Sequence, residues 1–347
     1  MTAKRRLHSL DALRALAAIL VLAFHFEGLL YTDPPNYVIS PDGFWLHYAL
    51  LGVELFFVIS GFVILMTLES ALTIRDFAIN RVARLYPAYW LSVALAFSYF
   101  ALFGRTSIAT LFVNLTMLQK FVWMPNLITP YWSLAYELWF YVAMASVAAL
   151  GQLERVVQLS FVWLGLAAGM ILCGFRPQGL LGLLTLLQFG HLFIAGMMLY
   201  LIYSNRKTPL VWTVLAMSIC FSLFGRPDWS LVSNRAYFLV NASFIVLVYL
   251  ASSGRLDKMA FPWLTAIGAS SYSLYLLHLP IALFLWSVAV GAGYPRWVGI
   301  LVAIPASLVA AALSRRLIEI PGQRLLRRMA ANWSLRKSAT FQGQASE

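Results

Sequence analysis

The sequence predicts an all-α fold, a polytopic membrane helical bundle of about ten transmembrane helices, and three observations support this prediction. Hydrophobic residues make up 61% of the chain and charged residues only 11%, with a mean hydropathy of +0.79, far from the composition of a soluble domain. Apolar segments close to the bilayer-spanning length of about 20 residues recur along the whole chain. The 24 Phe, 16 Tyr and 12 Trp are typical of a protein that packs against lipid and anchors at its interfaces.

A sliding window of about 20 residues places ten candidate spans on the chain. They lie near residues 10–30, 46–68, 85–103, 131–150, 156–174, 182–203, 209–224, 236–251, 265–289 and 297–314. The stretch 106–121 is a poorer span, and we interpret it as an interfacial or re-entrant helix. We expect a transmembrane domain over residues 1–322 and a basic cytoplasmic tail over 323–347. The tail is either a short helix on the inner membrane surface or a solvated segment.

The distribution of basic residues predicts that both termini are cytoplasmic. Of the 25 Lys and Arg residues, Arg14 lies within a span and six lie in segments that would face outward, which leaves 18 in cytoplasmic segments. This asymmetry follows the positive-inside rule. The net charge of +12 does not indicate a nucleic-acid partner, because the basic residues fall between apolar segments instead of along one face.

The first span carries two ionisable residues, Arg14 and His25, eleven positions apart. At about 100° and 1.5 Å per residue, they share one helix face and lie about 16 Å apart along it. Such a face cannot contact lipid without a cost of several kcal/mol. The pair therefore predicts a polar interior that runs along this helix.

Four ionisable residues on four spans are expected in one layer of the outer half of the membrane: His25, Glu54, Glu137 and His278. Any one of them alone can be a buried polar group that is hydrogen-bonded for packing. Together they favour a site, because each placement carries its own insertion cost. Imidazole can take a proton from an alcohol, and a nearby carboxylate can orient it, so this layer predicts acid-base chemistry.

A second group of charges, Arg81 and Arg84, precedes the third span at the cytoplasmic side. Residues three apart share a helix face, and two guanidinium groups there can hold phosphate. The alternative is a simple positive-inside anchor of that span. One end of the protein is thus expected to bind a phosphorylated cytosolic ligand, and the other to do acid-base work.

These residues also carry a family resemblance, because six motifs occur in an order that is similar to that of the acyltransferase-3 family of integral membrane acyltransferases. The match runs from Leu10 to about Pro321. The motifs are Arg14 with His25, GVELFFVISGF at 52–62, Arg81 with Arg84 before LYPAYW, YWSLAYELWFY at 131–141, SYSLYLLHLP at 271–280, and Glu319 with Pro321. One departure is that Leu279 separates His278 from Pro280.

The resemblance implies a multi-pass protein of the bacterial inner membrane that transfers an acyl group, usually acetyl, from cytosolic acyl-CoA to a hydroxyl of a cell-surface or exported glycan or glycolipid. It implies His25 as general base or transient acyl carrier, oriented by Glu54 or Glu137, with His278 in the same cavity. Arg14, Arg81 and Arg84 would hold the CoA phosphates, and acetyl-CoA would be the acyl donor. No metal is expected, because five histidines without a Cys/His cluster give no ligand set.

The expected donor path is one continuous cavity, open to the cytosol and narrowing toward His25, through which a pantetheine arm could reach about 16 Å. Two other classes stay open at this point. A glycan or lipid flippase would also need a wet, charged interior, although it would not need the cytoplasmic arginine pair. A structural subunit of an envelope complex would need neither feature, and stoichiometric acyl-CoA binding would separate the three.

Overall fold

The computed structural model describes residues 7–31, 46–227, 230 and 232–344, and every regular element in these ranges is a helix. The α-helices are α1 His8–Tyr31, α2 Gly52–Leu68, α3 Ile74–Leu102, α4 Ile108–Leu115, α5 Tyr131–Ala149, α6 Val156–Leu172, α7 Gly179–Leu184, α8 Gly190–Tyr203, α9 Pro209–Phe221, α10 Asn234–Ser252, α11 Pro262–Ala269, α12 Ser271–Gly291, α13 Arg296–Ser314 and α14 Ile320–Gln344. Short 3₁₀ helices cover His47–Leu51, Leu153–Arg155 and Asp257–Met259, and a π-helical turn covers Arg315–Glu319. The predicted all-α class is confirmed.

Within these ranges, seven helical stretches are long and apolar enough to cross a bilayer. They are His8–Tyr31, His47–Leu68, Ile74–Leu102, Leu153–Leu172, Asn234–Ser252, Ser271–Gly291 and Arg296–Asn332. The predicted span at 182–203 is divided between α7 and α8, and α9 has only 13 residues. The stretch at 106–121 forms the eight-residue α4 and a turn. The count of ten spans and the cytoplasmic placement of both ends stay predictions.

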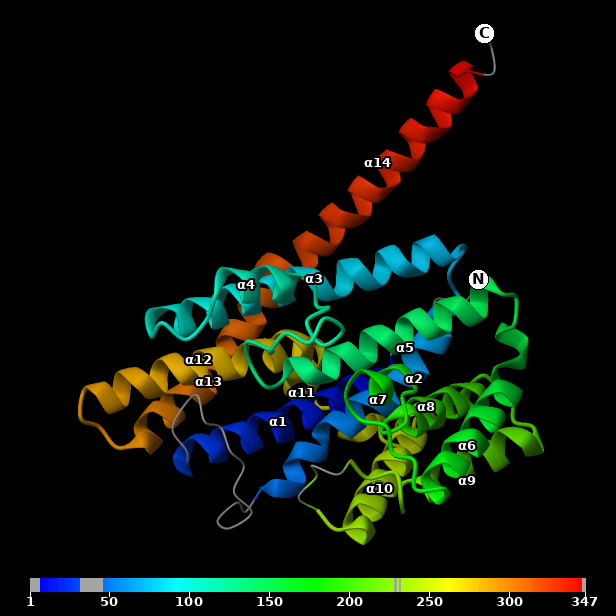
Figure 1. The fold of residues 1–347 in the computed structure, drawn as a ribbon, viewed down its shortest axis with the longest axis horizontal. Coiled ribbons are helices and arrows are strands. Elements are labelled where there is room, and N and C mark those ends of the chain that lie inside the picture. Colours follow the sequence, from blue (N-terminus) through cyan, green and yellow to red (C-terminus); the bar gives the residue numbers. More distant parts are fainter. Residues whose placement is uncertain (1–6, 32–45, 228–229, 231, 345–347) are drawn as a thin grey trace.

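Helix α1 lies at the centre of the bundle and packs against α2, α10, α11, α12 and α13 (Figure 1). Two glycines allow the closest of these contacts. Gly52, at the start of α2, lies against Ala17 and Val21 of α1, and Gly268 of α11 lies against the carbonyl of Asp11. A side chain at either glycine would collide with α1, so small residues set the approach of the helices, as is usual where helices pack in lipid.

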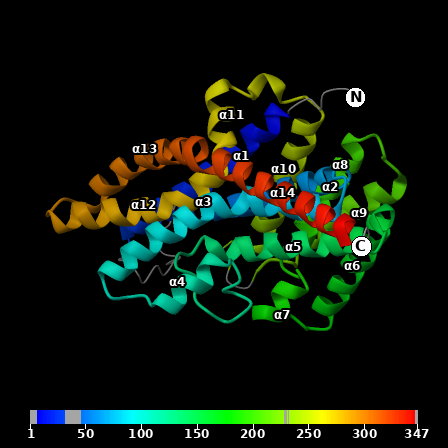
Figure 2. The same cartoon turned by 90° about the horizontal axis from the view of Figure 1, so that it is seen from above.

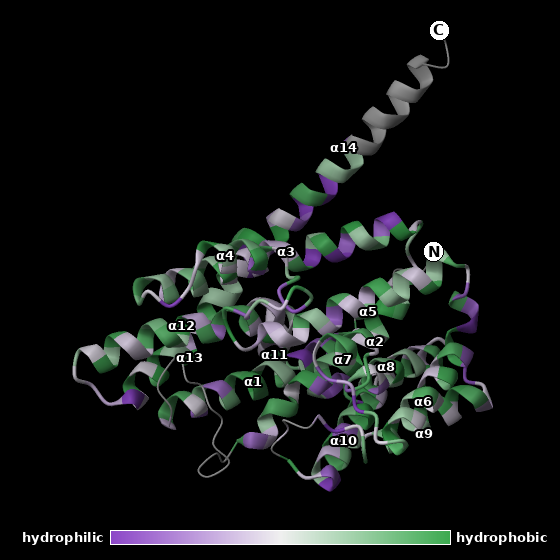
Figure 3. Cartoon of the chain, viewed as in Figure 1, coloured by the Kyte–Doolittle hydropathy of each residue, from purple (hydrophilic) through white to green (hydrophobic). Residues whose placement is uncertain are grey.

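The contact between α2 and α8 is set in the same way. Gly61 of α2 touches the backbone of Phe193, and Gly196 of α8 touches the backbone of Val58 and Phe62. Seen from above, α4, α5 and α7 lie on one side of the bundle and α11 on the other, with α12 and α13 extending from one end (Figure 2). Apolar residues dominate the ribbon of the bundle (Figure 3), and exposed side chains such as Leu166, Val246 and Leu301 fit a lipid-facing surface.

The last span continues beyond its predicted end at residue 314. The π-helical turn joins α13 to α14, which projects away from the bundle (Figure 1). A π turn inserts one residue into the helical repeat and so rotates the faces that follow it. Glu319, the last residue of this turn, is consequently directed into the protein, where its side chain is 1% exposed.

Candidate functional site

Two of the predicted site residues, His25 of α1 and His278 of α12, form a buried pair. His25 Nδ1 lies 3.3 Å from His278 Nε2, and the ring centroids are 5.0 Å apart. The Nδ1 atoms also lie 2.8 Å from the Val21 carbonyl and 3.1 Å from the Leu274 carbonyl, respectively. Helices α1 and α12 pack directly against each other, which brings together histidines 253 positions apart.

The hydrogen bonds assign a tautomer to each ring. A carbonyl can only accept, so each Nδ1 must carry the proton that it shares with the carbonyl one turn earlier. The Nδ1–H of His25 then donates mainly to the Val21 carbonyl at 2.8 Å, and Nε2 of His278, at 3.3 Å, is a second, weaker acceptor of the same proton. This assignment makes Nε2 the basic atom of His25, and His278 stabilises the positive charge that forms when His25 takes up a proton.

His25 lines a cavity of ≈ 290 Å³, which we call the histidine cavity. Its other walls are Phe24, Leu50, Lys120, Thr129, Trp132, Tyr136, Gln178, Gly179 and Gln188. These residues come from the second half of α1, the 3₁₀ helix His47–Leu51, the start of α5, the connector at 116–130 and the segment 173–189, which contains α7. The volume is close to the lower end of the range of small-ligand sites, about 300–1,000 Å³.

The predicted arginines line a different cavity, nearer the N-terminal end of α1. A hollow of ≈ 110 Å³ holds Arg14, Arg81, Arg84 and Glu137, and a larger hollow of ≈ 420 Å³ shares Arg14 and Arg84 with it. The larger hollow reaches Leu7 at the start of the described chain. We call the two together the arginine cavity. Four arginines line it, the fourth being Arg315, together with the three carboxylates of Asp11, Glu137 and Glu319, so the basic groups outnumber the acidic ones by one.

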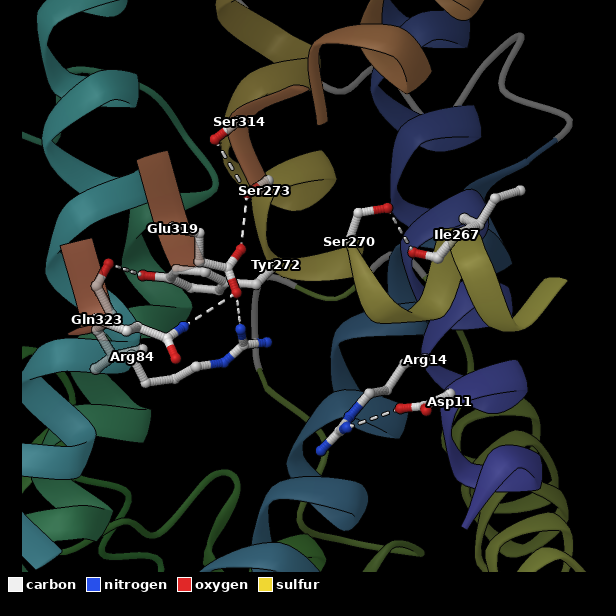
Figure 4. A network of polar contacts seen from close by, with 11 residues as sticks. Asp11, Arg14, Arg84, Ile267, Ser270, Tyr272, Ser273, Ser314, Glu319 and Gln323 are labelled. Carbon is white, nitrogen blue, oxygen red and sulfur yellow. Dashed lines mark hydrogen bonds and ion pairs between the residues drawn. The ribbon is translucent and has the colours of Figure 1, made fainter. Parts of the chain in front are cut away.

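Each arginine is held by protein groups. Arg84 forms an ion pair with buried Glu319, which also accepts hydrogen bonds from Ser273 at 2.9 Å and Gln323 at 3.4 Å (Figure 4). The Arg84 guanidinium lies over the Tyr272 ring, 5.6 Å from its centroid. Arg84 and Glu319, which belong to two of the six motifs, therefore form an ion pair with each other. This pairing was not expected from the sequence.

Arg81 and Arg14 complete the cationic wall. The Arg81 guanidinium lies 5.6 Å from the centroid of Phe77 and 5.7 Å from that of Tyr141, and its Nε atom has no hydrogen-bond partner among the described residues. Arg14 forms an ion pair of 3.3 Å with Asp11, one turn earlier in α1 (Figure 4). The side chains are therefore fixed by neighbours that leave donor atoms for a phosphate-bearing ligand.

Glu137 does not orient His25, which corrects the sequence-based expectation. Its carboxylate accepts hydrogen bonds from Ser60, at 2.5 Å, and from Tyr141, and it lines the arginine cavity. The reason lies in the register of α2 and α5, because Ser60 of α2 takes Glu137 as its partner deep in the bundle. Glu137 therefore belongs with the arginines, to which it adds one negative charge.

Glu54 also makes no hydrogen bond with His25 in the part of the chain that the structure describes, so the expected contact is not observed for this residue either, and its role stays a prediction. Gly52 packs against the middle of α1, and Glu54 consequently lies in the first turn of α2, below the level of His25. Its side chain is buried, and Oε2 has no hydrogen-bond partner among the described residues.

A buried polar group that was not expected from the sequence interacts with Glu54. His191, Tyr237 and Asn241 are each fully buried, Tyr237 and Asn241 interact through their side chains, and neither ring nitrogen of His191 has a hydrogen-bond partner among the described residues. His191 and Tyr237 contact each other with ring centroids 6.5 Å apart. A histidine inside the apolar run at 182–203 was the available signal, the same one that singled out His25 and His278.

The arginine and histidine cavities share no lining residue, so the expected continuous cavity is absent from the described structure. A partition separates them. The Tyr275 hydroxyl contacts Ser133 at 2.6 Å and donates to the Pro130 carbonyl at 2.8 Å, and the Tyr275 ring packs on Phe56. Tyr275 thus borders the arginine cavity on one side and contacts the ring of His278 on the other.

No group of three or more His, Cys, Asp or Glu side chains that could hold a metal ion occurs in the described residues. The fold and these two cavities define a class: a multi-pass membrane protein with an arginine-lined cavity and a buried histidine pair along one helix, α1. Comparison with known proteins then gives the family. Residues 7–316 match the acyltransferase-3 family, whose model is described as an acyltransferase domain, and the chain belongs to this family.

Curated relatives are similar over most of the chain at low identity. O-acetyltransferase OatA of Staphylococcus aureus is 26% identical over 371 residues, covering 92% of this chain and 58% of OatA. Exopolysaccharide production protein ExoZ of Rhizobium meliloti is 25% identical over 323 residues, covering 85% and 94%, respectively. Peptidoglycan O-acetyltransferase OatA of Listeria monocytogenes is 27% identical over 368 residues, covering 90% and 55%. The chain thus spans little more than half the length of the OatA relatives. No solved structure matches it.

Proposed function

We propose that this protein is an O-acyltransferase of the bacterial inner membrane that moves an acyl group, acetyl by preference, from cytosolic acyl-CoA to a hydroxyl of a cell-surface or exported glycan or glycolipid. The observation that carries the proposal is that α1 borders two different groups of residues. Arginines surround its Arg14, and a histidine pair is formed at its His25. The family membership and the relatives' names, which include O-acetyltransferase and exopolysaccharide production, support the reaction type.

The arginine cavity is the proposed donor site. Arg81, Arg84 and Arg14 would hold the phosphates of acyl-CoA, since guanidinium groups bind phosphate through paired N–H donors. Glu319 fixes Arg84 from the buried side and so orients its fork before the ligand arrives. Most of this binding is uniform, which means that it lowers KM more than it raises kcat.

The histidine pair is the proposed chemical centre. Nε2 of His25 takes the proton from the acceptor hydroxyl while its oxygen attacks the thioester carbonyl. The tetrahedral intermediate then collapses, the carbon–sulfur bond breaks, and the departing thiolate takes the proton from the imidazolium. The Val21 carbonyl, with Nε2 of His278 as a second acceptor, holds the Nδ1–H of His25 throughout, and both acceptors stabilise the charged ring. For the two cavities to meet, the partition at Tyr275 has to open.

The test is the binding and kinetics of acetyl-CoA with the full chain in proteoliposomes. We expect saturable binding at one molecule per chain, and a rise of about tenfold in KM for Arg81→Ala with kcat within about twofold. Arg81→Lys should restore binding only in part, because a lysine lacks the planar fork. Arg75→Ala is the matched control, because Arg75 lies on the same helix and is exposed.

Two outcomes would count against the proposal. A large fall in kcat with KM unchanged would mean that Arg81 acts in the chemistry or in folding. An absence of acetyl-CoA binding to the wild-type chain would favour the transporter class, which needs a charged interior and no acyl donor.

A further inference from the structure

The residues that line the histidine cavity are of the types that bind sugars. This inference is about the acceptor substrate, and it rests on the proposed function. One wall is aromatic. Trp132 and Tyr136 contact each other with ring centroids 5.9 Å apart, and Phe24 lies beside His25 at 5.2 Å. A pyranose ring has an apolar face of C–H groups that packs on aromatic rings, while its hydroxyls need polar partners at the edge.

The histidine cavity is also lined by polar side chains that can hydrogen-bond to sugar hydroxyls. Gln188 accepts a hydrogen bond from the Tyr136 hydroxyl at 3.1 Å, and its amide nitrogen donates no hydrogen bond within the described residues. Thr129 and Gln178 add a hydroxyl and a second amide to the wall. These groups both donate and accept, as recognition of sugar hydroxyls requires.

Lys120 gives the cavity a positive charge. Its Nζ lies 4.8 Å from the centroid of the Tyr136 ring, and no described carboxylate lies within ion-pair distance of it. Partial burial lowers the pKa of Lys120, because desolvation disfavours the charged ammonium. An anionic group on a ligand beside Nζ would offset this cost.

The two connectors that carry these groups are held in a fixed shape. Buried Asn114 bonds to the Pro125 carbonyl at 3.0 Å and to the Leu127 N–H at 3.1 Å, which ties down the connector that contains Lys120. Met117 and Trp123 of this connector and Leu186 of the other have positive φ angles of 63°, 60° and 53°. Non-glycine residues hold such conformations only where the surroundings enforce them, and this is common at ligand sites.

The cavity also has room to continue. A hollow of ≈ 680 Å³ shares Trp132 and Thr129 with it and holds Arg105 on its wall. A saccharide whose reacting unit sits at His25 could therefore extend its neighbouring units over Trp132 into this second hollow. A single small alcohol would need no such extension.

We propose that the histidine cavity is the acceptor site and takes a saccharide that carries an anionic group, with its ring on Trp132, its negative charge at Lys120 and its reacting hydroxyl at Nε2 of His25. The anion has two sources with the same chemistry, a carboxylate of an acidic sugar and the diphosphate of a lipid-linked sugar. Trp132, Gln188 and Lys120 are specificity residues in this arrangement.

The test uses three disaccharides of equal length: one neutral, one with a uronic acid carboxylate, and one with a diphosphate at its reducing end. Their binding to the purified full-length chain is measured by titration calorimetry without acyl-CoA. At least one acidic disaccharide should bind ten times more tightly than the neutral one. Lys120→Met should remove that difference, and Lys120→Arg should keep most of it.

Control variants separate the site from general effects. Arg235→Met removes an exposed cation outside the cavity and should change nothing, while Trp132→Leu should weaken binding of all three disaccharides by about tenfold, the loss of one stacked ring. Whichever acidic disaccharide binds better identifies the source of the anion.

Three different results would each contradict a different part of the proposal. Equal binding of the neutral and acidic sugars that Lys120→Met does not alter would overturn the anionic assignment. Binding of none of the three would overturn the site, even if the protein transfers acetyl to other acceptors. Normal sugar binding without transfer from acetyl-CoA would instead refute the proposed function and leave the sugar site standing.

Discussion

The arginine cavity and the histidine cavity are both lined by residues of α1, and they differ in how their charged side chains are paired. In the arginine cavity the cations are many and each is held by the protein, as Glu319 holds Arg84. In the histidine cavity the central group is His25, which contacts His278 behind it, and the cation, Lys120, has no carboxylate partner among the described residues. This difference fits the proposed function, in which one cavity binds a donor of fixed, multiple charge and the other holds a base that changes charge during the reaction.

The largest expected effect is the loss of acylation when His25 of the histidine cavity is replaced. His25→Ala should reduce acceptor acylation by at least about 10²–10⁴-fold, because an unassisted hydroxyl is a poor nucleophile at neutral pH. Binding of acetyl-CoA in the arginine cavity should not change. Acylation is measured in cells and in proteoliposomes at equal amounts of inserted protein, with exposed His8→Ala on the same helix as the control. Near wild-type acylation by His25→Ala would remove this residue from the chemistry.

The next effect tests how the arginine cavity is held. Arg84→Ala should lower stability by about 3–5 kcal/mol, because it leaves the buried Glu319 carboxylate without its partner. The double variant Arg84→Ala with Glu319→Gln should regain part of this loss. Thermal unfolding in detergent gives both values, and a double-mutant cycle isolates the coupling. Additive effects of the two changes would show that the pair does not act as a unit.

The smallest effect concerns the partition between the two cavities. Tyr275→Phe removes the hydroxyl that contacts Ser133 and the Pro130 carbonyl, a loss of about 1 kcal/mol per hydrogen bond. A weaker partition should let water reach the thioester, so hydrolysis of acetyl-CoA without acceptor should rise by a few-fold. Release of free CoA is the measurement. An unchanged hydrolysis rate would place the barrier elsewhere, for example at Phe56.

Sequence reasoning predicted the helical class and the meeting of His25 with His278, because apolar length and the cost of buried ionisable groups are local properties of a segment. It expected Glu54 and Glu137 beside His25, because depth was counted from expected helix ends. In the structure Glu54 follows the start of α2 at Gly52, which packs against the middle of α1, and Glu137 bonds to Ser60 and Tyr141. Such a register depends on the contact between two helices and is not visible in either one.

The partnership of Arg84 and Glu319 was also out of reach. The two residues lie 235 positions apart, and the π-helical turn that directs Glu319 inward breaks the periodicity from which its face would be read. The burial of His191 could have been predicted, since it is a histidine in an apolar segment. Tyr237 and Asn241 were not, because only the packing of α10 against α2 and α8 shows that they are buried together.

The partition at Tyr275 has an electrical consequence. Each elementary charge moved across the membrane potential costs about 2.3 kcal/mol per 100 mV. In the proposed reaction the phosphates of the donor stay with Arg81 and Arg84, and only the uncharged pantetheine arm with its acyl group reaches past Tyr275. The transfer is then electrically silent, and its rate should be the same in energised and de-energised vesicles.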